Sequence, residues 1–548
     1  MKNKIKSTLY GATALLTGLC ATSCDSFLEE YSQDLAKVNS WEDLDEVLLG
    51  SGYLHSGRQY VENYQLNTER DDHFDILHFM SDELVMTDDN SNISGYYESM
   101  FPFFTWQKDT GMDKQLRYSG GDEVYFNAPY TRINVCNMVL SVIDDQPEPT
   151  DEDAVQKRRV KGEAYFLRAL YYFTLANLYC EPYNPATAAT ALGMPIKYSE
   201  IIEDKEYHRS NLKETYENVL SDLAEAERCL TGTTRKSIYH ADVATVHLLQ
   251  SRVYLYMQDW DNAIAKAKEV LDENNRLLNI GTKAIGETCL DASSPEVLFS
   301  MGDYLIAFYF QNDRYSDVSL QISPDMLNLY SRDDYRADRY IGTTKWRGRN
   351  VFRKVNGQEE AEGAYTSVGS TFTFRTAEAY MTLAEASAYK GDDATARATM
   401  EKFVATRMST PASVPQSGNA LIDFIRDERA REFLLESHRW FDLRRYTVCA
   451  EYPWSKTIEH GYIYNDNRSY DYTDWYRLEK NDAAYTLPLP RKVINFQVSL
   501  GNISRPDRIP FATTHVHGPY YGSWDVENPG DDSGDDDDDD WDDDDWDW

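Results

Sequence analysis

Two helical hairpins with the same internal spacing constrain the fold of this chain more than any other feature. In the first hairpin, Ser251 and Ala263 lie twelve residues apart, with Tyr254 and Trp260 between them. Residues 380–407 repeat the same spacing between two alanines and place a glycine in the turn. Small residues let antiparallel helices approach closely, and aromatic residues fill the groove between them. The alternative is an ordinary helical hairpin with alanine contacts, but two matched copies favour tetratricopeptide-type repeats and a mainly α fold.

The periodicity of apolar residues predicts further helices in front of the first hairpin. The clearest lies at residues 157–179, where apolar side chains recur at three- and four-residue steps over a wide face. Other helices are predicted there at residues 40–49, 130–144 and 211–230, and the two helices of the first hairpin are predicted at residues 241–257 and 260–273. Between the two hairpins, residues 276–373 read as a loop-rich insert with short strands, because Gly, Asp, Ser, Pro and Tyr interrupt brief apolar runs. A similar region follows the second hairpin, with a short edge strand predicted at residues 485–490.

The first residues of the chain have the pattern of an exported lipoprotein. Three lysines precede an apolar run that is too short to span a membrane, and small residues lead up to Cys24. This order predicts a signal peptide over residues 1–23 and acylation of Cys24, which would tether the protein to a membrane through several acyl chains. The alternative is an ordinary cysteine close to a simple cleavage site. The acidic residues that follow Cys24 resemble a surface-export signal of bacterial lipoproteins, and this resemblance implies display at the cell surface.

Charge and cysteine content exclude several classes of function. The formal net charge of -37 repels nucleic acid phosphates, so nucleic acid is not an expected partner. Five cysteines remain after the signal peptide and Cys24, and their wide spacing predicts neither disulfides nor a zinc site. The pair His515 and His517 has metal-like spacing but no third ligand nearby, so a loop histidine pair is the better interpretation. No nucleotide or hydrolase motif appears, and no cofactor or metal is predicted.

Residues 516–548 form a low-complexity tail. Residues 531–548 contain thirteen Asp and no basic residue, and such a segment buries too little apolar surface to fold, so it is predicted to be disordered. A solvated tail is the simplest interpretation, with loose calcium binding as an alternative. Trp541, Trp546 and Trp548 interrupt the aspartates, and nothing in the sequence explains why.

Seven short motifs, in order, resemble the SusD/RagB family of outer-membrane nutrient-binding lipoproteins. They lie at residues 23–28, 130–134, 162–169, 193–196, 374–386, 425–445 and 487–490. The resemblance covers essentially all of residues 24–515. The chain departs from the family pattern in having Ser437 where some members have Gly, and in its acidic tail.

The resemblance implies a tetratricopeptide-type scaffold with repeats at about 130–275 and 374–446, carrying the loop-rich insert. It also implies a surface lipoprotein of the outer membrane, without enzymatic activity, that captures glycan. The glycan would be delivered to a SusC-like TonB-dependent transporter, which the protein caps. Oligopeptide capture is the alternative within the family. A surface glycoside hydrolase and an adhesin are the alternatives from other classes.

Glycan capture needs aromatic rings on exposed loops, with amide and charged groups beside them to bond the hydroxyls. Two groups of residues fit this requirement, although burial in the core is the competing interpretation for each aromatic. The candidates are Tyr96, Tyr97, Phe104 and Trp106 with Asn90 and Asn92, and Tyr309, Tyr315 and Trp346. The arginine-rich motif at residues 428–445 is instead predicted to be a structural charge network, with Trp440 and Phe441 in the core.

Overall fold

The structure is a computed structural model. It describes residues 38–54, 74–86, 99–201, 205–301, 320–343, 348–355, 368–369, 372–410, 412–466 and 469–515. The predicted signal peptide, Cys24 and the acidic tail lie outside these ranges.

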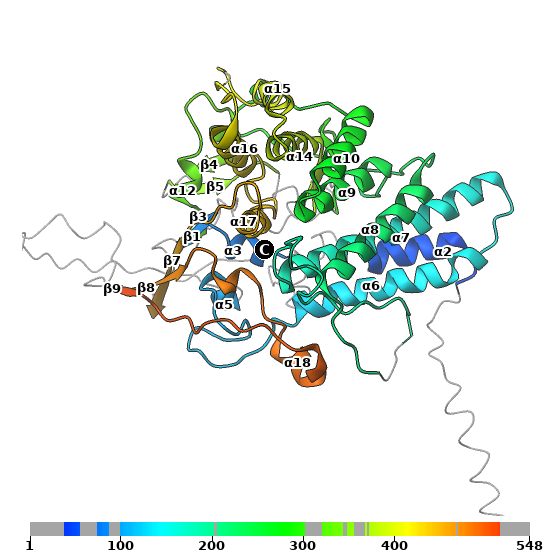
Figure 1. Ribbon diagram of the computed structural model, residues 1–548, viewed down its shortest axis with the longest axis horizontal. Coiled ribbons are helices and arrows are strands. Elements are labelled where there is room, and N and C mark those ends of the chain that lie inside the picture. Colours follow the sequence, from blue (N-terminus) through cyan, green and yellow to red (C-terminus); the bar gives the residue numbers. More distant parts are fainter. Residues whose placement is uncertain are drawn as a thin grey trace, which may run out of the picture.

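Helices form an array that runs through the molecule from α2 and α6 to α16 (Figure 1). Its members are α2 (Trp41–Val47), α6 (Val124–Val142), α7 (Asp151–Tyr179), α8 (Leu212–Leu230), α9 (Val243–Met257), α10 (Trp260–Glu273), α14 (Thr376–Tyr389), α15 (Asp393–Val404) and α16 (Gly418–Glu432). Neighbours along the chain pack against each other, from α6 on α7 to α14 on α15. Helices α2, α7 and α8 each begin with a capping box. The side chain of the residue before the helix accepts a hydrogen bond from the backbone of the third helical residue, whose side chain accepts one from the backbone of that capping residue.

The two predicted hairpins have matching turns. In the first, Gln258 adopts a left-handed conformation with φ 63°, and the Asp259 side chain caps α10. In the second, Gly391 has φ 81° and Asp392 caps α15. The small residues that define the spacing, including Ser251 and Ala263, are fully buried. This geometry confirms the tetratricopeptide-type, mainly α scaffold.

The insert leaves the helical array and returns to it, because α10 packs directly on α14 although about a hundred residues separate them. Trp260 and Tyr389 meet across this contact with ring centroids 4.8 Å apart. Arg252 of α9 donates two hydrogen bonds to the Glu378 carboxylate of α14, at 2.6 and 2.7 Å. At the root of the insert, β2 (Val297–Phe299) pairs antiparallel with β6 (Phe374–Arg375).

The remaining elements build an irregular lobe beside the array, at the left and bottom of Figure 1. Its strands are β1 (Leu84–Met86), β3 (Leu320–Ile322), β4 (Ile341–Thr343), β5 (Asn350–Phe352), β7 (Ile458–Asp466), β8 (Ser469–Leu478) and β9 (Ala512–His515). Its helices are α3 (Ile76–Phe79), α5 (Phe101–Phe104), α12 (Pro324–Leu327), α13 (Arg336–Arg339), α17 (Arg439–Thr447) and α18 (Arg491–Phe496). All the strand pairs are antiparallel: β1 with β3, β4 with β5, and β7–β8–β9 as a three-stranded sheet.

One long apolar core runs through both the array and the lobe, and a smaller core lies between α14, α15 and α16. Trp440 is fully buried and Phe441 nearly so, which confirms their predicted place in the core. None of the helices in the described ranges is both long and apolar enough to cross a lipid bilayer.

Candidate functional site

Most of the predicted ligand contacts lie outside the described residues. These are Asn90, Asn92, Tyr96, Tyr97, Tyr309, Tyr315 and Trp346, together with the predicted lipidation site Cys24. The strands on either side of these segments are described, however, and they show where the segments begin and end.

The strands bring the ends of the candidate segments together. β1 ends at Met86, just before the first segment, and β3 begins at Leu320, just after the second. Met86 and Leu320 are directly paired, so both segments leave the protein from one end of the same two-stranded ladder. The third segment, which contains Trp346, joins the paired ends of β4 and β5, and β5 packs beside β3. The first two candidate segments therefore each have one end attached at the Met86–Leu320 pair, and the third is attached to the neighbouring strand β5.

Phe104 and Trp106 are buried, so the structure corrects the prediction for these two side chains. Trp106 is only 1% exposed, and its Nε1–H donates to the Met80 carbonyl at 2.9 Å. The imidazole of His460 stacks on both rings, with centroid distances of 4.2 Å to Phe104 and 4.4 Å to Trp106. Burial lowers the pKa of His460 to about 4, which keeps this imidazole neutral at physiological pH. A ring packed in this way offers no free face to a sugar.

An aromatic pair that the sequence analysis missed lies at the root of the first candidate segment. Tyr464 of β7 and Tyr472 of β8 are cross-strand partners, with ring centroids 4.6 Å apart and planes 17° from parallel. Both side chains are half-buried. The backbone N–H of Ile463 donates to the Met86 sulfur at 3.4 Å, which places the pair beside the end of β1. Alternating tyrosines on both sides of the run Asn465-Asp466-Asn467 were the available sequence signal for this hairpin.

A polar cavity of about 300 Å³ opens next to Ser99, directly after the first candidate segment. Its wall includes the edge-to-face pair Phe103 and Tyr125, with centroids 5.4 Å apart, and the carboxylate of Asp122. Asp122 Oδ2 accepts a hydrogen bond from Thr110 at 2.6 Å, whereas Oδ1 has no partner among the described residues. Burial, reinforced by the charges of Asp109 and Glu123, raises the pKa of Asp122 to about 6.

The arginine-rich motif forms the predicted structural network. Asp442 accepts hydrogen bonds from Arg429 at 2.7 Å and from Arg445 at 2.8 Å. Arg439 forms a two-pronged pair with Asp82. The guanidinium of Arg444 instead donates to backbone carbonyls, including that of Tyr485 at 2.5 Å. Because these groups are buried and bonded to the protein itself, they form no anion site.

Two clusters of the described residues contain potential metal ligands, but each already holds basic side chains. The guanidinium of Arg159 donates to Asp45 and Glu163, and His240 bonds the Glu163 carboxylate. In the second cluster, on α8, α9 and α10, Glu227 and Glu269 hold the ammonium group of Lys266, and His247 pairs with the same two carboxylates. In both places the protein supplies the positive charge that the carboxylates need.

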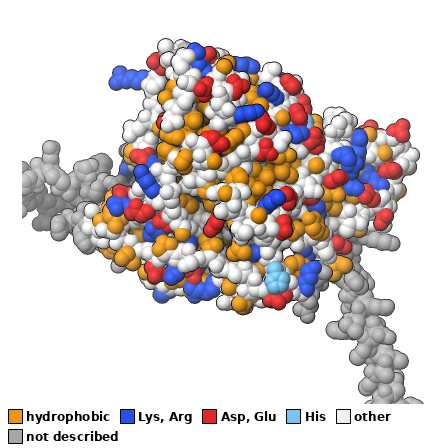
Figure 2. Space-filling view, viewed as in Figure 1, with side chains coloured by type: hydrophobic (Ala, Val, Ile, Leu, Met, Phe, Trp, Pro, Cys, Tyr) orange, Lys and Arg blue, Asp and Glu red, His pale blue; other side chains and the backbone are white. Residues whose placement is uncertain are grey.

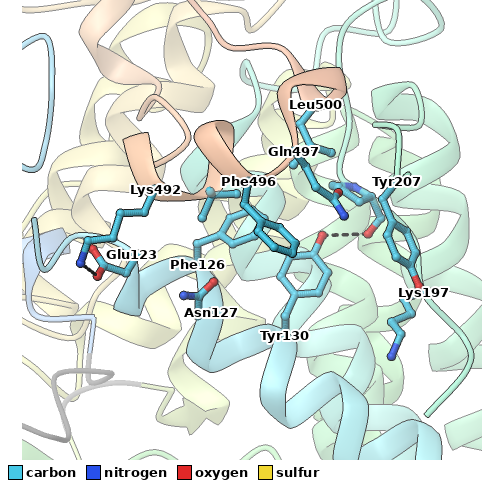
Figure 3. A pocket seen from close by; sticks show the side chains of 12 residues that line it. Glu123, Phe126, Asn127, Tyr130, Lys197, Tyr207, Lys492, Phe496, Gln497 and Leu500 are labelled. Carbon is cyan, nitrogen blue, oxygen red and sulfur yellow. Dashed lines mark hydrogen bonds and ion pairs between the residues drawn. The ribbon is translucent and has the colours of Figure 1, made fainter. Parts of the chain in front are cut away.

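A second cavity, of about 410 Å³ and mainly apolar, lies beneath α18 (Figure 3). Aromatic rings from α6, from the segment before α8 and from α18 form its walls. Glu123, the residue after Asp122, and Lys492 of α18 both line this cavity, and the Lys492 ammonium group donates to the Glu123 carboxylate.

Comparison with known proteins identifies the family. The model of the SusD family matches residues 304–503, and a second family model, described as "Starch-binding associating with outer membrane", matches residues 26–255. No curated protein matches the chain.

Solved structures show the same fold. A putative sugar binding protein from Bacteroides vulgatus superposes with a TM-score of 0.64 at 20% identity, covering 85% of this chain and 98% of that one. A SusD superfamily protein from Bacteroides thetaiotaomicron gives 0.64 at 19% identity, covering 85% and 100%. A SusD-like carbohydrate binding protein from Bacteroides vulgatus gives 0.62 at 19% identity, covering 85% and 98%. With both family models matching in order along the chain, the protein belongs to the SusD-like family.

Proposed function

We propose that this protein captures glycan at the outer membrane and passes it to a SusC-like TonB-dependent transporter without cleaving it. The family model that matches the N-terminal half is named for starch binding and outer-membrane association, and two similar structures are described as sugar or carbohydrate binding proteins. We further propose that residues 24–515 form the ligand-binding domain and that acylated Cys24 anchors it at the cell surface.

The stacked, half-buried tyrosine pair beside the Met86–Leu320 attachment point is the observation that carries this proposal. Sugar rings present C–H faces, and these pack well on flat aromatic surfaces that are partly exposed. The stacked pair Tyr464 and Tyr472 offers such a surface beside Met86, where the first candidate segment begins. Burial and a hydrogen bond with Tyr476 raise the pKa of Tyr464, so its phenol stays neutral and bonds hydroxyl groups without a charge. We therefore place the glycan against this pair and the loops rooted beside it.

The first experiment measures binding by the full chain carrying Cys24→Ala, which removes the predicted lipid. Native affinity gels and calorimetry against polysaccharides, oligosaccharides and peptides would be combined with product analysis in the same samples. Retardation by one glycan class without new products is expected. Binding to peptides alone would favour oligopeptide capture, and turnover would indicate a surface hydrolase. Adhesion to host surfaces with no soluble ligand would favour an adhesin.

A paired substitution tests the location of the site. Tyr472→Ala should weaken glycan binding by roughly 5- to 30-fold, the equivalent of ~1–2 kcal/mol for an aromatic contact. Trp475 lies three residues along β8 on the opposite face, where its Nε1–H donates to Thr514 at 3.2 Å. Trp475→Ala is therefore the matched control and should leave the affinity unchanged. Equal effects of both substitutions would remove the site from this face of the hairpin.

Membrane attachment has its own test. In cells, Cys24→Ala should move the protein from the membrane fraction to the soluble fraction, because stable anchoring depends on the acyl chains. Persistent attachment of the variant would refute lipidation at Cys24. Loss of a transporter of the TonB-dependent type should abolish glycan uptake while leaving glycan binding by this protein intact.

A further inference from the structure

The apolar cavity beneath α18 is built to receive a flat hydrophobic group. Figure 3 shows Phe126 and Tyr130 of α6 facing Phe496 of α18 across it, with Tyr207 at one side. The phenol of Tyr130 donates to the Pro195 carbonyl at 2.7 Å, so its polar atom is satisfied and its ring is left for packing. The cavity volume of about 410 Å³ lies in the range of small-molecule and side-chain binding pockets.

The helix over the cavity exposes an unusual amount of apolar surface. None of the residues of α18 is buried, Phe496 is 86% exposed, and the neighbouring Val498 is 76% exposed. In Figure 2 hydrophobic side chains reach the surface around the position of α18, with basic side chains beside them. Contiguous exposed apolar groups of this kind mark interaction sites.

Basic groups stand at two edges of the cavity. Lys197 donates to the neutral amide of Asn134 at 2.7 Å, and Lys492 forms an ion pair with Glu123. The lining thus has two lysines against one glutamate, a net charge of +1, in a chain whose formal net charge is -37. An apolar slot flanked by positive charge favours an aromatic group with acidic neighbours.

We propose that a tryptophan of the chain's own segment 531–548 occupies this cavity, with adjacent aspartates facing Lys197 and Lys492. In that segment Trp541, Trp546 and Trp548 each have aspartate next to them. Tryptophan brings a large apolar area with a single polar group, which suits a mainly apolar pocket with amides at its edge. The segment therefore matches the cavity in both shape and charge. Binding in the cavity would also explain why tryptophans stand among the aspartates.

The chain is long enough to make this contact. Leu500 lines the cavity and Ala512 begins β9, so the cavity lies within about 40 Å of β9, the maximum span of the intervening residues. From His515 to Trp541 the chain can extend to about 85 Å, and a flexible chain of that length has a root-mean-square span of roughly 28 Å. A tether of this kind gives an effective concentration in the millimolar range, so a weak contact is enough to keep the cavity occupied.

Photo-crosslinking in the full chain tests the proposal directly. With p-benzoylphenylalanine placed in turn at Trp541, Trp546 and Trp548, irradiation of the monomer should give adducts on residues 123–130, 195–207 or 491–500 from at least one position. Adducts between two molecules would overturn the proposal in favour of docking by a second copy. Adducts elsewhere in the chain, or none, would also overturn it.

A binding measurement separates the cavity from general charge attraction. The recipient is the full chain with all three tail tryptophans replaced by serine, and the probe is a labelled peptide of residues 531–548 followed by fluorescence anisotropy. Phe496→Ser should weaken binding by roughly 5- to 30-fold, because it removes one aromatic wall. Val498→Ser is the control, since this side chain is also largely exposed but does not line the cavity.

Charge is tested in the same assay. Lys197→Glu should weaken binding, and the difference from the unsubstituted recipient should shrink at 1 M salt, where screening acts within ~3 Å. If Phe496→Ser and Val498→Ser have the same effect, or if a peptide with serine at the three tryptophan positions binds as well, the proposed contact is refuted. Neither result would bear on glycan capture at the β7–β8 face.

Discussion

Asp122 should make the protein less stable as the pH rises from about 4 to 6. Its carboxyl group is 3% exposed, and its pKa is raised from the ordinary value of 3.8 to about 6, mainly by burial. The unfolded chain ionises this group near pH 4, whereas the folded chain resists ionisation until about pH 6. Folding is therefore unaffected by the group below pH 4 and is opposed by it above pH 6.

The size of this effect follows from the shift. A difference of 2.2 pKa units between the folded and ordinary values corresponds to about 3 kcal/mol at pH 7.5. A domain of this size changes its unfolding free energy by about 1 kcal/mol per kelvin near the melting temperature. The substitution Asp122→Asn removes the ionisation and keeps an oxygen that accepts from Thr110. The melting temperature of the variant, relative to that of the unsubstituted protein, should therefore rise by about 3 °C between pH 4 and pH 7.5.

Differential scanning calorimetry of both proteins at five or six pH values would measure this difference. The control is Asp113→Asn in the same loop. At Asp113, burial, which would raise the pKa, is outweighed by hydrogen bonds from Arg117, and the pKa is lowered. This carboxyl is already largely ionised in both the folded and the unfolded chain above pH 4, so the control should stay nearly parallel to the unsubstituted protein from pH 4 to 7.5. If the melting temperatures of Asp122→Asn and the unsubstituted protein stay parallel from pH 4 to 7.5, Asp122 is not held in the environment described.

Two further predictions concern stability. Glu432 is fully buried and forms ion pairs with Arg336, Arg375 and Arg407, so Glu432→Gln should cost about 3–5 kcal/mol by leaving buried charge uncompensated. The exposed pair of Arg397 with Glu401 is the comparison, and Glu401→Gln should change stability by no more than about 1 kcal/mol in urea unfolding. Gly193→Ala would place a Cβ 2.2 Å from the Thr215 hydroxyl oxygen and should lower the unfolding free energy by about 1–3 kcal/mol. At Gly50 an added Cβ meets nothing within 4 Å, so Gly50→Ala is the control, and equal losses of stability would refute the tight contact at Gly193.

Local patterns predicted the helical array well because its determinants are close in sequence. The turn at Gln258–Asp259 and its counterpart at Gly391–Asp392 combine a left-handed residue with an aspartate cap, and both lie between small buried residues. Such features depend on ten or twenty neighbouring residues and can be seen in the sequence. Helix α6 began six residues before its predicted start, at Val124, with Pro129 inside its early turns.

Contacts between distant segments could not be predicted in this way. Phe104 and Trp106 lie in a short, aromatic, loop-like stretch, and the side chain that stacks on both rings, His460, comes more than 350 residues later. The edge strand predicted at residues 485–490 was wrong for a similar reason. The Arg444 side chain bonds the Tyr485 carbonyl, and the N–H of Leu487 donates to the carbonyl of Leu178 at the end of α7, at 2.9 Å. The backbone groups of residues 485–490 thus bond a side chain and the end of a helix, and not a neighbouring strand as the apolar pattern suggested.

Of the candidate site, the sequence indicated the loops but not the surface at their root. The pair Tyr464 and Tyr472 depends on the register of a hairpin whose turn the apolar pattern did not distinguish from the surrounding loops. The pocket beneath α18 also joins segments far apart in the chain, from Glu123 to Leu500. Binding surfaces of this kind are set by tertiary packing, and a single sequence shows only their components.

The way in which the insert joins the helical array suggests how proteins of this architecture can diversify. The β2–β6 pair ties the insert to the segment that leads into α14, and α10 and α14 pack directly on each other. The insert is thus a cassette, and its loops can lengthen or change composition while the array keeps its geometry. Whether an insert is compatible with the array depends on one cluster of buried ion pairs. In this cluster, Glu296 and Arg336 from the insert pair with Arg375, Arg407 and Glu432 of the array. Exchanging cassettes between homologues should succeed when these five residues are exchanged as a unit and fail when the set is split.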